Sequence, residues 1–557
     1  MTELITAPDG TAARRRRALL ALLALACLYV GALAWRMRAL VVDDAYIGFV
    51  FLRNLLEGHG FVFHPGGPAV EGVTNIGWIL ALAPLAALTG PVLAAKLLGA
   101  ILLFAALVLT GAVGRILAGR PGPLPHAETL MLAPPLLLAA SFEFLYFPLT
   151  GMETAALACT LLAMARIALT QPFSLALPAL GAFAFTLHPE AVLVYPLYAL
   201  LRLMSFRLSF EARLRRAPQD EAELSAQLPH PHPEVRGESR ASKDEGRMAT
   251  AVSRLIGGAL LYAGLLAAIT LARWLAFSAL LPNTFASKPP AELGAMVGGL
   301  IEAVAGGHVG IGFPTAGLLG LWLLALGWLR LRRTEPDAAA ILGATVATGL
   351  LFALYARADW TLSPRYFAPY LPAAALLLWT GALDLGARLW PGRVLPLAVF
   401  GAILIAVLGV SFGARMGALE RFPGYVMASR TLVAPAAAIA KIVPEGEVIA
   451  TRRIGALAYV SRRPVFDYVY GLTDPEVARE VARRGKAFEH PNDAELVAIW
   501  RARAPAWIIE DEGVLAEIAR KAGGTLEGFT LKGSRFRAER RFRIAPGVDW
   551  VLARRVH

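Results

Sequence analysis

The stretch from Asp43 to Trp78 reads DDAYIGFVFLRNLLEGHGFVFHPGGPAVEGVTNIGW and lies between two apolar parts of the chain. It contains two adjacent acids, another acid at Glu71, two histidines and a run of glycine and proline. A short connection between apolar segments does not need so many polar groups unless they contact something. We interpret this stretch as a polar site at the surface of a membrane, and the composition of the whole chain supports that setting.

The chain has 557 residues, of which 57% are hydrophobic and 17% charged, and its mean hydropathy is +0.57. Soluble domains are about 45–50% apolar and about 25% charged. The apolar residues form continuous Leu/Ala/Val blocks of about 20 residues, the length that spans a bilayer as a helix. Because backbone amides in lipid must be satisfied within their own segment, these blocks predict a polytopic α-helical membrane protein.

The block over 172–204 is too long for one upright span and is interrupted by His188-Pro189-Glu190. This interruption predicts either a helix break that lines a cavity or a structural His–Glu pair. With this block counted as one or two spans, the total is about ten to twelve helices. The expected blocks are 18–35, 76–90, 92–114, 129–148, 151–170, 172–204, 253–280, 311–330, 337–357, 367–389 and 394–414.

The net charge of +13 comes largely from arginines at the ends of apolar blocks, which is typical of membrane topology and gives no reason to expect a nucleic-acid partner. Arginine runs at 14–17 and 330–333 predict cytoplasmic connections. The expected organisation is a cytoplasmic tail (1–17), a transmembrane domain (18–416) with an outer loop at 36–75, and an outer domain (417–557). We therefore expect a multi-pass protein of the cytoplasmic membrane whose site and C-terminal domain face outwards.

Two segments differ from the apolar blocks. Residues 206–252 are polar and arginine-rich with few large apolar residues, which predicts a disordered cytoplasmic insertion. Residues 417–557 combine short β-rich runs with helical stretches and predict an α/β domain. The expected strands are EVIAT, ALAYVS, PVFDYV, AWIIE and WVLAR, and the expected helices are DPEVAREVARR and GVLAEIARKA.

Asp43 and Asp44 open a predicted amphipathic helix that ends at Gly58. Adjacent side chains on a helix point about 100° apart, so the two acids have different tasks. One can be the N-cap, and the other is then a carboxylate at the membrane interface. Acids in such positions are often functional.

Further polar residues have both structural and functional interpretations. Glu71 precedes a span whose start Asn75 can cap, and Glu153 can complement the dipole of a helix. Lys288 can meet lipid headgroups, and Arg365-Tyr366 fits an interfacial belt. Both cations fall on the expected outer side with Asp43, and a carboxylate between cations suits attack on a lipid-linked phosphosugar. The two cysteines, Cys27 and Cys159, are expected in the apolar core, with no metal motif.

These motifs together resemble the polytopic GT-C glycosyltransferases: DDAYIGFVFLRNLLEGHGFVFHPGG with VEGVTN, then GMET, PNTFASK, and RY before a proline-rich span. Within that superfamily the pattern is most similar to the lipid-linked arabinofuranosyltransferase-like group. The resemblance covers nearly the whole chain apart from the N-terminal tail and residues 206–252. It implies a GT-C-like transmembrane domain with a C-terminal extracytoplasmic α/β domain.

The resemblance also implies site residues. The general base corresponds to Asp43 or Asp44, and we favour Asp43 because Asp44 is better placed to start the helix. A second acid corresponds to Glu153, and the cation that binds the donor phosphate corresponds to Lys288 or Arg365. The expected substrate-binding residues are His59, Glu71, Asn75, Lys288, Arg365 and Tyr366. Two positions depart from the family pattern, His188 in place of arginine and Arg453-Ile454 in place of an acid before Gly455.

The resulting hypothesis is a glycosyltransferase that moves a sugar from a polyprenyl-phosphate donor to a hydroxyl of a glycan, lipid or protein, with inversion. No cofactor is required, and a divalent metal has no support in the sequence. Besides donor and acceptor, the expected partners are membrane lipids. The alternatives are a transporter or flippase of lipid-linked sugars, which predicts internal repeats, and a scaffold whose outer domain recruits partners.

Overall fold

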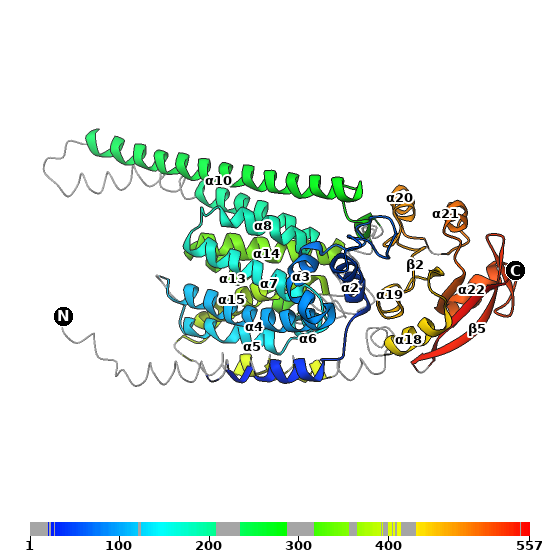
Figure 1. Ribbon diagram of the computed structural model, residues 1–557. Helices are drawn as coiled ribbons and strands as arrows, with labels where there is room; N and C mark the ends of the chain where they lie inside the picture. Colours follow the sequence, from blue (N-terminus) through cyan, green and yellow to red (C-terminus); the bar gives the residue numbers. More distant parts are fainter. Residues whose placement is uncertain are drawn as a thin grey trace.

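The computed structural model has a helical bundle and a C-terminal part that carries a sheet (Figure 1). It describes residues 21, 24–26, 28–120, 124–207, 234–286, 294, 317–355, 365–391, 393, 399–403, 405–406, 409–410, 412–413, 431–488, 490–545 and 547–556. The tail expected at 1–17 and the expected site residue Lys288 lie outside these ranges.

An apolar helix over 24–36 precedes α2 (Asp43–Leu56), which is the helix expected after the two acids, and Gly58 follows α2 with a φ of +82°. Further elements of the bundle are α3 (Ile76–Thr89), α4 (Pro91–Ala118), η1 (Ala127–Met131), α5 (Ala133–Ala139), α6 (Phe142–Leu149), α7 (Thr154–Thr170), α8 (Ala176–Leu187), η2 (Pro189–Leu193), α10 (Glu234–Phe277), α11 (Asn283–Ala286), α13 (Gly317–Thr334), α14 (Pro336–Tyr355), η3 (Arg365–Tyr370) and α15 (Leu371–Leu389).

The two faces of α4 have different environments. One face packs on α7 and η1. The other carries Leu93, Leu97, Ile101, Phe104 and Val108, which are 41% to 60% exposed and recur every three or four residues. A continuous apolar stripe of this kind is unfavourable in water and suits contact with lipid chains, so we assign this face of α4 to the bilayer.

Helices α13 and α15 pack at very short distance through glycine. A Cβ atom on Gly327 would lie 1.9 Å from the carbonyl oxygen of Leu377, and one on Gly381 would lie 2.0 Å from that of Leu323. Small residues at such crossings let two backbones approach, which is the usual way that membrane helices associate. The bundle is therefore closely packed inside although it has a lipid-facing surface.

Among the described residues, four helices are long and apolar enough to cross a membrane: 91–118, 249–277, 336–355 and 365–389. The pair 127–139 and 142–149, bent by 63°, makes a fifth if it is counted as one span. Shorter apolar helices, among them α3, α7 and α8, occupy other expected blocks. The multi-pass helical architecture is thus confirmed, and the total of about ten to twelve spans stays a prediction.

The insertion expected to be disordered at 206–252 is helical in its second part, because α10 begins at Glu234 and continues for 44 residues. Its first half is rich in Glu, Arg, Lys and Ala, which favour helix. The apolar second half of α10 nucleates the helix. Each residue of the first half then extends an existing helix and does not have to start a new one. Figure 1 shows α10 running along one side of the bundle.

The C-terminal part is built on a six-stranded sheet with the order β2-β1-β3-β6-β5-β4, in which β1 pairs parallel with β2 and β3 and the other pairs are antiparallel. Its elements are α18 (Val433–Ile442), β1 (Ile449–Ala450), α19 (Gly455–Ser461), β2 (Val465–Phe466), α20 (Pro475–Arg484), α21 (Leu496–Arg503), β3 (Trp507–Asp511), α22 (Glu512–Lys521), β4 (Phe529–Leu531), β5 (Ser534–Ala545) and β6 (Val548–Val556).

Four of the expected strand runs contain strands, and both expected helices are present as α20 and α22. The expected strand ALAYVS is wrong, because residues 455–461 form helix α19. The run lacks the apolar–polar alternation of a half-buried strand, and most of it is buried: Gly455, Ala456, Leu457, Ala458 and Ser461. A short, mostly buried apolar run can be a helix or a strand, and periodicity alone does not decide between them.

The two parts meet where α2 packs along α19. The rings of Tyr46 and Tyr459 are 5.2 Å apart, and Arg53 Nη1 donates to the carbonyl oxygen of Tyr459 at 2.7 Å. A Cβ atom on Gly455 would lie only 2.1 Å from the carbonyl oxygen of Asp43. Glycine at position 455 is therefore what allows the start of α19 to reach the start of α2.

Candidate active site

The two adjacent acids at the start of α2 bind different parts of the molecule. Asp43 accepts hydrogen bonds from the backbone N–H groups of Gly455 (3.3 Å) and Ala456 (2.7 Å), at the start of α19. Asp44 accepts a hydrogen bond from Arg365 at 2.5 Å. The residue that precedes α2 is Val42, and no side chain caps this helix. The expectation that one acid is the N-cap of α2 is therefore wrong, because Asp43 contacts the start of another helix.

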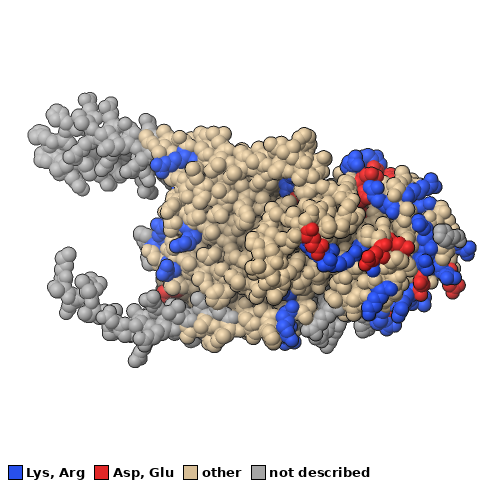
Figure 2. Space-filling view, viewed as in Figure 1, with Lys and Arg blue, Asp and Glu red and all other residues tan. Residues whose placement is uncertain are grey.

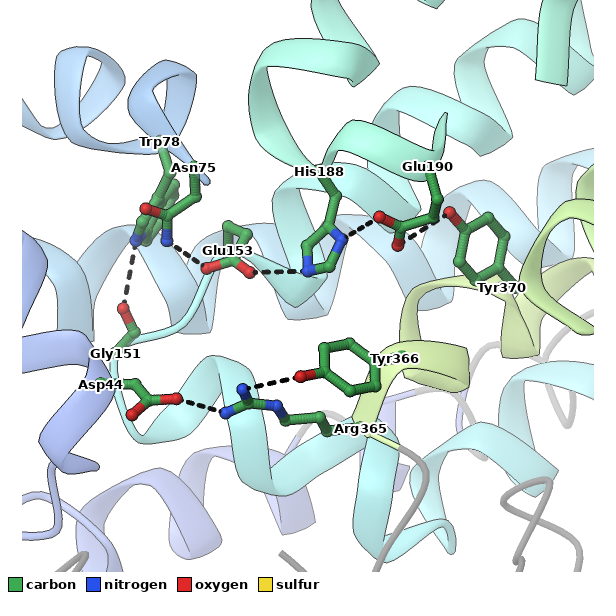
Figure 3. A network of polar contacts seen from close by, with 10 residues as sticks. All are labelled: Asp44, Asn75, Trp78, Gly151, Glu153, His188, Glu190, Arg365, Tyr366 and Tyr370. Atoms are coloured by element: carbon green, nitrogen blue, oxygen red, sulfur yellow. Dashed lines mark hydrogen bonds and ion pairs between the residues drawn. The ribbon is translucent and has the colours of Figure 1, made fainter. Parts of the chain in front are cut away.

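The Asp44–Arg365 pair lies at the end of the bundle that faces the C-terminal part, and Figure 3 shows it beside Tyr366. The Asp44 side chain is 33% exposed and that of Arg365 is 10% exposed. Arg365 also donates to the hydroxyl of Tyr366 at 3.1 Å. A partly exposed carboxylate thus lies against a largely buried guanidinium, which places a proton acceptor and an anion-binding group side by side.

A second row of polar contacts runs beside this pair (Figure 3). Asn75 Nδ2 donates to Glu153 at 2.6 Å, and the other carboxylate oxygen of Glu153 is 3.5 Å from His188 Nε2. His188 Nδ1 contacts Glu190, which accepts from the hydroxyl of Tyr370 at 3.3 Å. Glu153 and Glu190 are buried, so this row places two acids inside the bundle with partners on both sides.

Local sequence explains where these side chains lie. Pro189 starts η2, and a residue before proline is restricted to extended backbone. His188 accordingly has φ −155° and ψ 126°, which breaks the helix. Gly151 has φ +105° between α6 and α7, a conformation that other residues avoid. Its carbonyl oxygen accepts from Trp78 Nε1 at 3.1 Å and fixes the loop before Glu153.

The two groups of residues are adjacent through aromatic contact. The rings of His188 and Tyr366 are 6.0 Å apart in an edge arrangement. Phe352 packs on both of them, with ring distances of 5.9 Å to His188 and 5.1 Å to Tyr366. We therefore define the candidate site by both groups, and its residues are Asp44, Asn75, Glu153, His188, Glu190, Arg365, Tyr366 and Tyr370.

Four expected site residues are not placed in this cluster, and one of them is Asp43, which contacts α19. Glu71 is fully buried and pairs with Arg273 on α10 at 2.5 Å. His59 has an exposed side chain, 3.9 Å from Glu57. Lys288 lies outside the described residues. Among the residues that the structure describes, no group of His, Cys, Asp and Glu side chains is arranged to hold a metal ion.

The sequence interpretation missed Lys96, which ties together the two loops that carry the acids. Its ammonium group donates to the carbonyl oxygens of Met37 (3.1 Å), Leu40 and Leu149 (2.5 Å). An ammonium group has three N–H donors, so these bonds use all of them. Its signal in the sequence was a lone charged residue inside an apolar block, as it was for Arg273 in α10.

We expect Lys96→Met to loosen both acid-bearing loops. Three backbone carbonyls lose a charged donor, which should cost on the order of 2 to 4 kcal/mol. The apparent melting temperature in detergent should fall, and Lys441→Met, which changes an exposed lysine on α18, should leave it unchanged. Equal melting temperatures for the two variants would show that Lys96 does not hold the loops.

The contact between Asp43 and α19 should make stability depend on pH. Desolvation raises the pKa of Asp43 to about 6, although the two amides of α19 and Arg453 lower it. The folded state then holds this proton more tightly than the unfolded chain. The contribution of Asp43 to stability is therefore present below about pH 4 and is lost as the pH rises through about 6.

The expected result is a difference between wild type and Asp43→Asn, which cannot titrate. Measured from pH 4.5 to pH 7.5, the melting temperature of wild type should fall by a few degrees relative to that of the variant. Melting temperatures that change in parallel over this range would contradict the assignment.

Known proteins share this architecture. ArnT from Cupriavidus metallidurans bound to undecaprenyl phosphate superposes with a TM-score of 0.50 at 13% identity, over 96% of this chain and 97% of that chain. Its apo state gives the same TM-score and identity, with 97% and 98% covered. The oligosaccharyltransferase of Archaeoglobus fulgidus, tethered with an acceptor peptide, gives 0.51 at 11% identity, over 88% and 69%.

Residues 426–552 match a family described as a domain of unknown function, DUF8728, and no curated protein matches the chain. The similarity to the solved structures confirms the expected GT-C fold, with a helical membrane part followed by a C-terminal domain. The arabinofuranosyltransferase-like subgroup stays a prediction.

Proposed function

We propose that the protein is a membrane glycosyltransferase that moves a sugar from a polyprenyl-phosphate donor to a hydroxyl group of an acceptor. The observation that carries the proposal is the Asp44–Arg365 pair within a GT-C fold. Attack on a lipid-linked phosphosugar requires a proton acceptor and a cation for the departing phosphate. This pair supplies both at the end of the bundle that faces the C-terminal domain.

In the proposed step, the acceptor oxygen attacks the anomeric carbon, and its proton passes to the Asp44 carboxylate. The bond between that carbon and the phosphate oxygen breaks, and polyprenyl phosphate leaves with the bonding electrons. Arg365 binds the leaving phosphate by charged hydrogen bonds. One displacement of this kind inverts the anomeric carbon. The step assigns no task to a metal ion or a cofactor.

The geometry favours Asp44 over Asp43 as the base. Both oxygens of Asp43 accept backbone N–H groups at the start of α19. Asp44 is one-third exposed, so an acceptor hydroxyl can approach it. We therefore assign Asp43 to the contact between the two domains and replace it by Asp44 in the catalytic role expected from the sequence.

The proposed orientation in the membrane rests on the arginines. Figure 2 shows blue side chains at the end of the membrane part that lies away from the C-terminal domain, and a mostly uncharged surface between the two ends. Arginine is enriched on the cytoplasmic side of membrane proteins. We propose that this end is cytoplasmic, and that the site and the C-terminal domain face the outside of the cytoplasmic membrane.

The donor and acceptor are proposed by class. The structure of ArnT contains undecaprenyl phosphate, which makes this lipid the first carrier to test. The resemblance of the motifs to arabinofuranosyltransferases makes arabinofuranose the first sugar. The acceptor is a hydroxyl group of a glycan, a lipid or a protein.

The activity test uses the purified chain in lipid nanodiscs with radiolabelled sugars carried on polyprenyl phosphate. A transferase releases polyprenyl phosphate and puts the label on a second molecule. A transporter of lipid-linked sugars moves the intact lipid across a vesicle and releases none. Movement of the intact donor without release of polyprenyl phosphate would contradict our proposal and favour a transporter.

Arg365→Gln is expected to weaken the binding of undecaprenyl phosphate by roughly tenfold or more, because a charged bond to phosphate becomes a neutral one. Native mass spectrometry or a thermal-shift titration with this lipid measures the change. Arg388→Gln is a matched control, because Arg388 pairs with Asp384 on α15 in the same way. Equal affinity of wild type and Arg365→Gln would contradict the phosphate-binding role.

A further inference from the structure

The carboxyl ends of the parallel strands of the C-terminal sheet face the membrane part. Gly455, which follows β1, donates its amide to Asp43. Gly471, which follows β2, accepts a hydrogen bond from the side chain of Asn283 at 3.2 Å. Both loops therefore lie against the bundle, beside the helix α2 that carries Asp44.

The strand order reverses at this edge. The chain runs from β1 to β2 and then passes back to β3 on the other side of β1. In open α/β sheets, ligands bind outside the carboxyl ends of the strands at the point where the strand order reverses. Here that point lies between β1 and β3, and it is flanked by Arg453 after β1 and Asp511 at the end of β3.

Arg453 and Asp511 form a partly exposed ion pair in which one atom of each side chain is buried without a partner. Arg453 Nη2 donates to Asp511 Oδ2 at 2.7 Å, and the two side chains are 27% and 23% exposed. Within the described part of the chain, Arg453 Nε and Asp511 Oδ1 have no hydrogen-bond partner. Behind them, Glu510 is buried and accepts from Tyr468 at 2.6 Å, which fixes the edge of the sheet.

The chemistry of this pair selects its ligand. A guanidinium binds phosphate or hydroxyl oxygens, and the carboxylate of Asp511 beside it adds an acceptor for hydroxyl groups. Neighbouring hydroxyl groups of a sugar fit both, since they donate to the carboxylate and accept from the guanidinium. Tyr470, on the loop after β2, is 39% exposed and offers an aromatic face of the kind that packs on the apolar side of a sugar ring.

We propose that Arg453, Asp511 and Tyr470 form a carbohydrate subsite that holds a glycan acceptor next to Asp44. The inference rests on the proposed function and deepens it, because it selects a glycan among the possible acceptors. The distance is compatible with a single site. Gly455, which contacts Asp43, is two residues from Arg453, so their Cα atoms are at most about 7 Å apart.

The test measures glycan binding in the absence of donor. The full-length protein in nanodiscs is applied to an array of arabinan, galactan, mannan, rhamnan and lipopolysaccharide-core oligosaccharides. Wild type should bind at least one of them. Asp511→Asn and Arg453→Gln should each weaken that binding by about tenfold or more, the loss expected for a charged hydrogen bond, and Tyr470→Ala should weaken it as well.

Matched controls lie on the same domain. Lys521 and Glu517 pair at 2.8 Å near the far end of α22, and Lys521 is about 15 Å along that helix from Asp511. Lys521→Gln and Glu517→Gln should bind glycan like wild type. Melting temperatures show whether each variant is folded, and the double variant Arg453→Gln/Asp511→Asn serves if either single change unfolds the domain.

No glycan binding by wild type, or undiminished binding by the folded variants, would overturn the subsite. The binding of the lipid donor is tested by a separate experiment. If wild type and Arg365→Gln bind undecaprenyl phosphate equally well, the proposed function is contradicted. The glycan-array result does not depend on that comparison.

Discussion

Asp44→Asn is expected to lower the rate of sugar transfer by about 10²- to 10⁴-fold, the usual contribution of a general base. Asparagine has the same shape and still accepts a hydrogen bond from Arg365, but it cannot take the proton of the acceptor hydroxyl. The measurement is the rate at which the protein in nanodiscs releases undecaprenyl phosphate from a labelled donor. Binding of that lipid should persist, because Arg365, to which we assign the phosphate, is unchanged.

The neighbouring acid provides the comparison. Asp43→Asn keeps an oxygen that accepts a backbone N–H group of α19, so we expect it to retain most of the transfer rate. Both variants change one of two adjacent acids to its amide, and general effects on folding are therefore similar. A large loss in Asp43→Asn with little loss in Asp44→Asn would reverse our assignment of the two roles.

Arg273→Met is expected to cause the largest loss of stability, about 3 to 5 kcal/mol, because it leaves the carboxylate of Glu71 buried without a partner. Arg273 and Glu71 are 2.5 Å apart, with side chains 3% and 0% exposed. The pair ties the polar loop after α2 to the C-terminal end of α10. The apparent melting temperature in detergent should fall by many degrees.

The double variant Glu71→Leu/Arg273→Met tests the reason for that loss. It removes both charges and replaces them by apolar groups of similar size, which is often neutral or stabilising. We expect it to recover most of the melting temperature. A double variant as unstable as Arg273→Met would show that the loss comes from packing and not from the unpaired charge.

The fold could be predicted to a large extent because it follows from local pattern. The length of the apolar blocks predicts spanning helices, and the start of α2 at Asp43 agrees with the structure. Pro189 predicts the break at His188, since proline restricts the residue before it. Residues 456–461 were predicted wrongly, because a mostly buried apolar run has the same composition in a helix and in a strand.

The candidate site could be predicted only as a set of residue types. Asp44, Asn75, Glu153, Arg365 and Tyr366 were expected, and the structure brings them into one region. Glu71 was expected there too, but its partner is on a helix 202 residues further along the chain. The sequence shows that a buried acid needs a cation, and it does not show which cation is in reach.

The stretch Asp43 to Trp78 shows the division most clearly. The sequence by itself determined that two acids open a helix at a membrane surface, and that side chains about 100° apart cannot share a task. The tertiary structure alone decided the tasks, since Asp43 meets an amide 412 residues away in the sequence and Asp44 meets Arg365, 321 residues away. The reason is physical: the charge state and access of a carboxylate depend on the groups that surround it in space, and local sequence does not specify those groups.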